Sequence, residues 1–335
     1  MTSHTMPAPA PTPPRTSGLL KAARAVAILA CLPYVTLKVV WIAGGRVGIP
    51  DGSSLLDHRA TMAVANGVTV LMDAAVVVLA LLLTQAWGRR VQAWLLVLPL
   101  WVATGLLAPI VAGFPLQLLV RAFGGSSATS GEHTTPFLDP WVFGVVYGGF
   151  IVQALALGVL SVAYARRRWG VLWAGRVRDL PAGSPTAPAQ RAAATAAALL
   201  ALVPFVLHAL WGAGGTAGLN AARAAERTSD FYALEWMHAG FAASAAAGVL
   251  LLAFRRGGTL PVAVPLALAW VGSGALACWG GWMSVAALTG VDDLSSRPSA
   301  LLHLSYAVQM IVGMLVVTVG AYFCAERAAT VRRAE

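Results

Sequence analysis

The chain has 335 residues, of which 58% are hydrophobic and 11% are charged. An ordinary soluble domain is about 45–50% apolar and about 25% charged, so this composition excludes a soluble globule and a disordered chain. The net charge of +10 does not indicate a nucleic-acid-binding protein, because the basic residues lie between long apolar segments. What remains is a multi-pass membrane protein whose partner is the lipid bilayer.

Eight segments of the chain have the roughly 20 mostly apolar residues that a membrane-spanning helix needs. They follow a proline-rich segment, 1–21, which is predicted to be a disordered cytoplasmic tail. None of them alternates apolar and polar residues, which excludes a transmembrane β-barrel. The sequence therefore predicts an all-α polytopic membrane protein with helices near 22–43, 60–86, 91–113, 141–165, 192–213, 231–254, 260–284 and 301–324.

The basic residues predict the direction of the helices. If the N-terminus is cytoplasmic, sixteen of the 23 Lys and Arg residues fall in inner segments, six fall in outer loops, and Lys38 lies within a helix. Cytoplasmic loops of membrane proteins carry an excess of Lys and Arg. We therefore expect a bacterial cell-membrane protein with both termini in the cytoplasm.

The two halves of the chain share short matching stretches, which predict an internal duplication. Four helices per repeat give both repeats the same orientation, so a pseudo-two-fold axis would run along the membrane normal. The predicted units are a first four-helix repeat at 22–165, a basic cytoplasmic linker at 166–191, a second four-helix repeat at 192–324 and a cytoplasmic tail at 325–335. The matches pair 30–35 with 201–206, 41–45 with 211–215, 101–105 with 270–274, and 150–153 with 306–309.

The second repeat gathers ionisable residues near the outer ends of its helices. His208, Glu235, His238 and His303 are predicted within roughly 10 Å of the outer boundary, with Cys278 near the same depth. Three His, or two His and one Glu, suit zinc or another divalent metal, and two His on different helices suit a haem iron. The alternative is that they are interfacial residues hydrogen-bonded between helices.

The first repeat carries a different set of polar residues. Asp73 lies near the middle of the second helix, with Asn66 and Thr69 on the same face. Lys38 on the first helix leans toward Asp73, and Gln153 on the fourth lies at about the same depth. We interpret Lys38, Asn66, Asp73 and Gln153 as a candidate intramembrane polar pocket, with an ion pair that holds the bundle together as the alternative.

Outside these helices the sequence offers few chemical motifs. The longest outer loop, 114–140, contains a flexible Gly/Ser-rich stretch, and Asp292 with Asp293 resembles half of a diphosphate-metal motif. The chain has no Walker A, GxSxG, HExxH or GxGxxG sequence. No reaction is indicated by a motif alone.

Two resemblances to known families add expectations. With 21 Arg but two Lys among its basic residues, and with eight apolar segments, the chain resembles uncharacterised actinobacterial integral membrane proteins. That resemblance implies a fold and no activity.

A second resemblance is to heme A synthase. Glu235 to His238 looks like that family's Glu-x-x-His, and residues 44–46 with 52–55 are similar to its glycine-rich segment after the first helix. The resemblance implies two four-helix bundles that ligate haem through His on their second and fourth helices. Thr69 and Tyr147 stand at the ligand positions of the first bundle, so it implies at most one b-type haem, held by His238 and His303.

Three functions follow as hypotheses. The first is a membrane protein that is not an enzyme, such as a small transporter or a membrane-embedded binding or partner protein, with Asp73 as its central group. The second is a haem-binding redox protein or haem-modifying enzyme that uses His238 and His303. The third is a metal-dependent enzyme at the outer leaflet with Glu235 as its base. We favour the first.

Overall fold

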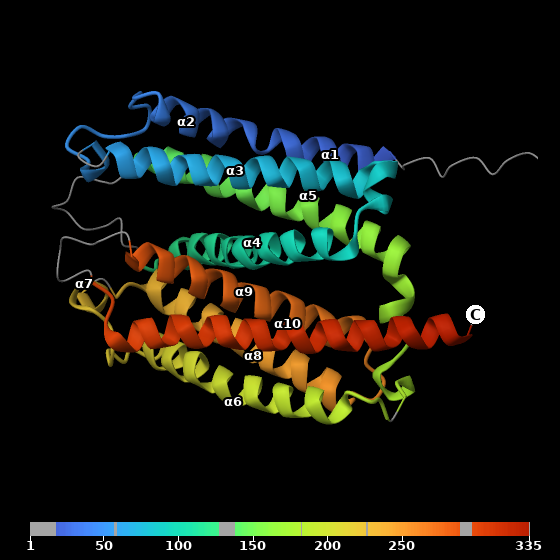
Figure 1. The fold of residues 1–335 in the computed structure, drawn as a ribbon. Helices are drawn as coiled ribbons and strands as arrows, with labels where there is room; N and C mark the ends of the chain where they lie inside the picture. The colour runs from blue at the N-terminus through green and yellow to red at the C-terminus, as the bar shows by residue number, and fades with distance from the viewer. Residues whose placement is uncertain are drawn as a thin grey trace, which may run out of the picture.

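Figure 1 shows the fold in a computed structural model of the protein, which describes residues 18–56, 59–126, 138–181, 183–225, 227–288 and 297–334. Most of the proline-rich tail and residues 127–137 of the predicted outer loop lie outside the described residues, as do His58, His133, and Asp292 with Asp293. The described part contains helices and no β-strand. The predicted all-α class is confirmed.

Eight spans in the described part are long and apolar enough to cross a membrane, and each falls on one predicted segment. Shorter helices lie in the connections: η1 (Ser54–Leu56), η2 (Ala86–Arg90), η4 (Val177–Asp179) and α7 (Ala221–Ala225). The spans are α1 with α2 (Gly18–Leu29, Leu32–Ile42), α3 (Arg59–Thr84), α4 (Ala93–Ala122), α5 (Pro140–Trp173), α6 (Ala187–Gly212), α8 (Ser229–Phe254), α9 (Ala263–Leu288) and α10 (Ala300–Ala334).

The sides of the spans expose apolar residues, as a bilayer requires. Large hydrophobic side chains that are at least one third exposed occur on every span, for example Leu71 on α3, Leu199 on α6 and Met314 on α10. A continuous apolar surface of this kind is stable in lipid and not in water, and the backbone polar groups of the helices are satisfied within each helix. The protein is a multi-pass membrane protein.

The first span is two helices in one line. The chain turns at residues 30 and 31 between α1 and α2, and Pro33 lies in the first turn of α2. Proline has no N–H to continue the helical ladder but fits a first turn, so the interruption falls just before it. This turn aims the side chains of α2 at α3 and α5.

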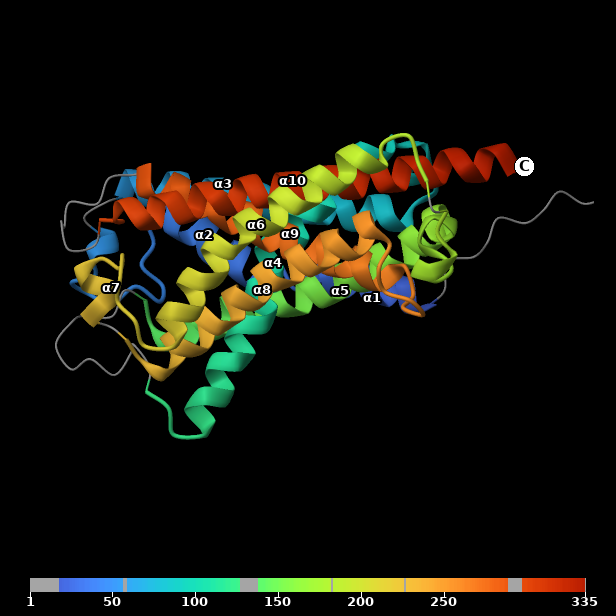
Figure 2. The same cartoon turned by 90° about the horizontal axis from the view of Figure 1, so that it is seen from below.

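α4 ends nine residues later than predicted. The sequence predicted an end near residue 113, but Pro109 and Pro115 both lie inside the helix, which continues to Ala122. Proline bends a helix without always ending it. Figure 2 shows the last part of α4 leaning away from the other helices, toward the start of α8. There Arg121 forms an ion pair with Asp230.

The helices form two groups with α4 between them (Figure 1). α1, α2, α3 and α5 pack together, and so do α6, α8, α9 and α10. α4 packs against α5 on one side and against α8 and α9 on the other, and it makes little contact with α3. We call the end of the molecule where α2, α4, α6 and α9 finish the α7 end, because α7 lies there; the sequence predicts that it faces outward.

Two glycines allow α4 and α9 to touch. A methyl group on Gly105 would lie 2.3 Å from the backbone oxygen of Gly274, and one on Gly274 would lie 3.1 Å from Cα of Gly105. Small residues let membrane helices approach closely and gain van der Waals contact. The two glycines therefore set the distance between α4 and α9.

Hydrogen bonds across the same contact are reciprocal. Trp101 Nε1 on α4 donates to Ser273 Oγ on α9 over 3.0 Å, and Trp270 Nε1 on α9 donates to Thr104 Oγ1 on α4 over 3.2 Å. Each helix thus supplies a Trp donor and, three residues later, a hydroxyl acceptor. A two-fold axis produces contacts of this kind, in which each side supplies the same donor and the same acceptor to the other.

The turns after α2 and α6 also have the same geometry. Trp41 Nε1 donates to the carbonyl of Val47 over 2.7 Å, and Trp211 Nε1 donates to the carbonyl of Ala217 over 2.9 Å. The glycine three residues after each Trp has a positive φ, +89° in the first turn and +96° in the second. Glycine takes that conformation without steric cost, which fixes both turns.

The predicted linker between the halves is partly ordered against the second group of helices. α5 continues into it, with its helical geometry interrupted at Trp169 (φ −131°, ψ 15°). Val177 N–H then donates to the carbonyl of Leu260, and Val262 N–H donates to that of Gly175. The linker is therefore held by backbone hydrogen bonds to the connection between α8 and α9.

Candidate functional site

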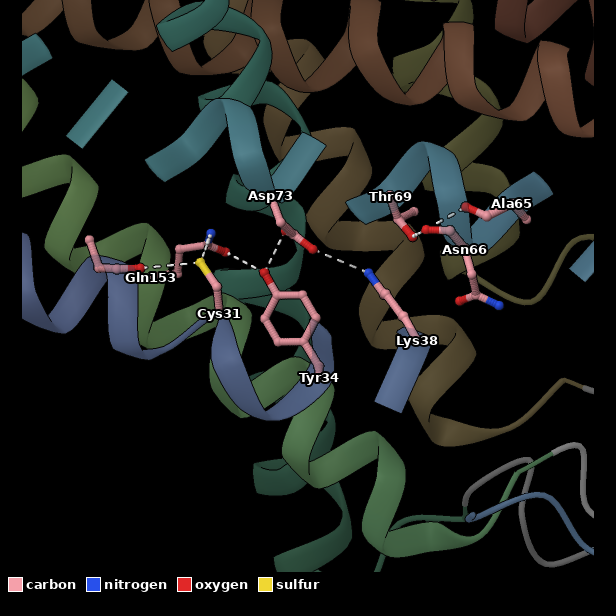
Figure 3. Close-up of polar contacts among 9 residues, drawn as sticks. Cys31, Tyr34, Lys38, Ala65, Asn66, Thr69, Asp73 and Gln153 are labelled. Atoms are coloured by element: carbon pink, nitrogen blue, oxygen red, sulfur yellow. Dashed lines mark hydrogen bonds and ion pairs between the residues drawn. The ribbon is translucent and has the colours of Figure 1, made fainter. Parts of the chain in front are cut away.

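A buried polar network joins three helices of the first group (Figure 3). Tyr34 Oη on α2 lies 2.5 Å from Asp73 Oδ1 on α3 and 3.1 Å from Gln153 Oε1 on α5. Lys38 Nζ lies 3.5 Å from Asp73 Oδ2, and Gln153 Nε2 donates to Cys31 Sγ over 3.0 Å. We call these five residues the Asp73 network.

The network is buried and closely packed. Asp73 and Lys38 are each 6% exposed. Lys38 Nζ lies 4.7 Å from the ring centre of Tyr34 and 5.6 Å from that of Phe150, so aromatic faces cover the ammonium group. Tyr34 and Lys38 are four residues apart on α2, which puts both on the face toward Asp73.

The Asp73 network can hold a proton in either of two arrangements. A phenol has one proton, so Tyr34 donates to Asp73 or to Gln153 but not to both. If Asp73 is ionised, Tyr34 donates to it, and a turned Gln153 amide donates to Tyr34 and accepts from the Cys31 thiol. If Asp73 is protonated, it donates to Tyr34, which donates to Gln153. Asp73, Tyr34 and Gln153 keep partners in both states, which is what a buried proton-accepting site requires.

Three of the four residues of the predicted polar pocket therefore meet, and the fourth does not. Asn66 Nδ2 donates to the carbonyl of Met62 on its own helix over 2.9 Å. Thr69 likewise donates to the carbonyls of Ala65 and Asn66, and neither side chain contacts Asp73 in Figure 3. Both satisfy themselves locally, as short polar side chains in helices commonly do.

A second buried network lies in the other group of helices. His208 Nδ1 on α6 lies 2.5 Å from Glu235 Oε2 on α8, and His208 Nε2 lies 3.3 Å from Gln309 Nε2 on α10. Gln309 also donates to Ser305 Oγ over 3.1 Å. A neutral His208 ring that donates from Nδ1 to the carboxylate has its Nε2 free to accept from Gln309, so each group has a complementary partner.

This second network forms part of the wall of a cavity of about 290 Å³ at the α7 end. We call this cavity the α7 pocket. Side chains of both groups of helices and of α7 contribute to it, and its size is near the lower limit for a small-molecule site. Its lining consists of Pro109, Ile110, Gly113, Phe114, Gln117, Tyr147, His208, Trp211, Arg223, Leu234, Glu235, Met237, His238, Trp279, Met283, Leu302, Ser305, Tyr306 and Gln309.

Several polar side chains in the α7 pocket have unused hydrogen-bonding capacity. Gln117, Tyr147, His238, Tyr306 and the guanidinium of Arg223 make no hydrogen bond to another side chain or carbonyl in the described part of the chain. The rings around them are aromatic and apolar. Convergent polar groups without partners in a largely apolar cavity are typical of a ligand site.

The four predicted haem or metal ligands do not all meet. The His238 ring stacks on the His208 ring with 5.1 Å between centroids, next to Glu235. His303 is exposed on α10, is absent from the lining of the α7 pocket, and its described ring contact is with Tyr306. Cys278 is a free thiol on α9. Among the described residues, no group of three or more His, Cys, Asp and Glu side chains is placed to hold a metal ion.

Two charged residues that the sequence did not single out join the end of α4 to the start of α8. Arg121 Nε and Nη2 on α4 both donate to Asp230 Oδ2 on α8, over 3.0 Å and 2.8 Å. Ser126 and Ser229 exchange backbone and side-chain hydrogen bonds beside them. These contacts hold the end of α4 against the first turn of α8, so Gly113 and Gln117 face Leu234 and Glu235 across the pocket.

A second, larger hollow lacks the features of a binding site. It measures about 500 Å³ and is lined by Gln85, Ala86, Trp87, Arg89 and Arg90, all on one short segment. All five are exposed. A hollow with no buried polar group and a single wall is open surface rather than a binding cavity.

Comparison of the chain with known protein families, with curated proteins and with solved structures finds no significant match. The assignment of a function therefore depends on the geometry of the two networks and the α7 pocket.

Proposed function

We propose that the protein is a cell-membrane protein that binds a small organic molecule in the α7 pocket, as a small transporter or a membrane-embedded binding protein. The observation that carries the proposal is the pocket itself, in which the buried His208–Glu235 pair and unpartnered polar groups face an apolar cavity. With both termini in the cytoplasm, as the basic residues predict, the pocket would be reached from outside.

The position of the pocket supports transport. Part of the proposal is that the chain consists of two repeats of one four-helix unit, 22–165 and 192–324. The reciprocal Trp bonds between α4 and α9, and the matching turns after α2 and α6, support that duplication. Transporters built from repeats bind their substrates where the repeats meet. The α7 pocket takes lining residues from both groups of helices.

The Asp73 network supports a coupling role in the same proposal. It lies apart from the α7 pocket, since none of its residues lines that cavity. An intramembrane carboxylate with a partner in both protonation states is suited to accept a proton during transport. The competing role is a static ion pair that joins α2 to α3. Asp73→Asn distinguishes them, because a coupling group loses transport with the fold intact.

The haem and metal hypotheses have weaker support in the geometry. A haem held by His238 and His303 requires both rings to face one space, and His303 lies on an exposed side of α10. A metal site requires a third ligand beside the paired His208 and Glu235. No contact in the described residues favours either over a small-molecule site.

Binding in the α7 pocket can be tested without knowing the ligand. Purified full-length protein in nanodiscs is heated with each member of a panel of organic metabolites, and an increase in melting temperature reports binding. Met283→Trp adds bulk to the pocket wall, whereas Met314→Trp places the same bulk on the exposed side of α10. We expect stabilising compounds that lose their effect in Met283→Trp and keep it in Met314→Trp. Stabilisation that survives Met283→Trp would place the site elsewhere.

A further inference from the structure

The charges of the α7 pocket are unequally available to a ligand. Glu235 is 3% exposed, and its carboxylate faces the His208 ring at 2.5 Å. Arg223, from α7, lines the pocket, and its guanidinium makes no hydrogen bond within the described residues. His238 and Tyr306 line the same pocket as Arg223. The anionic group of the pocket is occupied, and the cationic group is available.

Each of the unpartnered neutral groups in the pocket can donate a hydrogen bond. Tyr147 and Tyr306 each offer a hydroxyl proton, and the His238 ring offers an N–H from one of its two nitrogens. With the guanidinium of Arg223 they provide four donor groups from α5, α7, α8 and α10. A ligand with several acceptor oxygen atoms matches this set, and charge-assisted bonds to a guanidinium are the strongest it can form.

The rest of the lining is apolar and aromatic. Ile110 and Phe114 on α4 face Trp279 and Met283 on α9 across the cavity, and Trp211 contributes a further ring. Trp211 and Trp279 use their indole N–H groups on the carbonyls of Ala217 and Leu106, so their remaining surfaces are apolar. This part of the pocket favours a hydrocarbon or aromatic body.

We infer that the ligand of the α7 pocket is an organic acid with a compact apolar or aromatic body, whose anionic oxygens bind Arg223, His238 and Tyr306. This inference rests on the proposed function and names the class of ligand. An organic cation would meet Arg223 without a free carboxylate to pair with, and desolvating it there would cost more than it gains. A neutral ligand of the same shape would leave the guanidinium unpaired.

Three probes of one shape and different charge test the inference. Benzoate, benzyl alcohol and benzylamine are titrated at pH 7.5 against the full-length protein in nanodiscs by calorimetry. We expect benzoate to bind most tightly and benzylamine least. Arg223→Gln should weaken benzoate binding about ten- to hundredfold, as expected for loss of a charged hydrogen-bond pair, and should change benzyl alcohol binding less than about twofold.

Two variants control for charge and folding. Arg223→Lys keeps the charge and should retain most of the benzoate affinity. Arg46→Gln removes the same charge at the α7 end but outside the pocket, where Arg46 pairs loosely with Asp51 over 3.8 Å, and should change nothing. A melting temperature measured for each variant shows that it is folded.

The outcomes separate the ligand class from the pocket. Tightest binding by benzylamine, or benzoate binding that Arg223→Gln does not weaken, would overturn the organic-acid inference. If Met283→Trp still abolishes the binding of the probe, the proposed small-molecule site in the α7 pocket stands, and only the organic-acid inference fails. If none of the three probes binds, the organic-acid inference fails, and if the metabolite panel also gives no Met283-dependent stabilisation, the proposed function fails with it.

Discussion

The Asp73 network and the His208–Glu235 network place similar groups at similar positions and surround them differently. Lys38 and His208 each lie three residues before the Trp that holds the next turn, and Gln153 and Gln309 occupy matching positions on α5 and α10. In each half a carboxylate on the following long helix completes the set. One set is closed, and the other opens on a cavity.

The difference comes from the neighbouring side chains. In the first half, the Lys38 ammonium lies over the rings of Tyr34 and Phe150 and pairs with Asp73, which fills the space between the helices. In the second half, the shorter His208 leaves room, and Gly113 on α4 adds no side chain to the pocket wall at its own position. The comparison teaches that the same helix positions can be closed by their neighbours in one half and open on a cavity in the other.

The largest expected effect is in the first half. Asp73→Ala would leave the Lys38 ammonium buried without its counter-charge and should lower the free energy of unfolding by about 3–5 kcal/mol. The double variant Lys38→Met with Asp73→Leu should recover most of that loss, because it removes both charges. The free energy of unfolding is measured by titration with SDS in mixed micelles. Asp51→Asn, at an exposed ion pair, is the control and should show no measurable change. If Asp73→Ala is as stable as the wild type, the network is not structural.

A smaller effect is expected where α4 touches α9 of the second group of helices. Gly105→Ala puts a methyl group 2.3 Å from the backbone oxygen of Gly274 and should cost about 1–3 kcal/mol, because α4 and α9 must separate. Gly158→Ala on α5 meets nothing within 4 Å and should stabilise the protein by about 0.5–1 kcal/mol. The same SDS titration compares them. Equal effects of the two variants would show that the α4–α9 contact is not close.

The smallest effect tests the two-fold relation itself. Trp101→Phe and Trp270→Phe each remove one of the two reciprocal hydrogen bonds and should each cost about 0.5–1.5 kcal/mol. If the two hydrogen bonds are equivalent in energy, the two single variants lose the same free energy of unfolding within about 0.5 kcal/mol. The loss in the double variant then equals the sum of the two single losses. Unfolding of the three proteins is compared under identical conditions. Strongly unequal losses would show that the two bonds are equivalent in geometry but not in energy.

The spans were predictable because their signal is local. A run of apolar residues is needed wherever a helix crosses lipid, so the eight segments were identified from composition and length. The ends were less predictable. α4 was expected to end near residue 113 and continues through Pro115 to Ala122. α10 continues ten residues beyond its predicted end because Glu326 and Arg327 bond to residues of the linker region. Those stabilising contacts come from distant parts of the chain.

The sequence predicted which residues belong to the candidate site, but it did not predict which of them contact one another. Lys38, Asp73, His208 and Glu235 were identified because ionisable groups are rare within spans. Which of them meet depends on the rotation of each helix, and one sequence does not show it. Tyr34 could have been found from its spacing of four residues from Lys38. Arg223 and the Arg121–Asp230 pair gave no signal, since charged residues in a predicted outer loop are common.

The interrupted helical geometry at Trp169 has a mechanical consequence. Before it, Arg168 donates hydrogen bonds to the carbonyls of Gly88 and Val91, in the connection that follows α3 of the first group of helices. Soon after it, the carbonyls of Val171 and Ala174 accept from Arg327 on α10, which belongs to the second. The chain therefore passes from one body to the other within three residues. Any rocking of the halves would turn about this pivot, and a small rotation there would move the far end of the molecule, where the α7 pocket lies, through the longest arc.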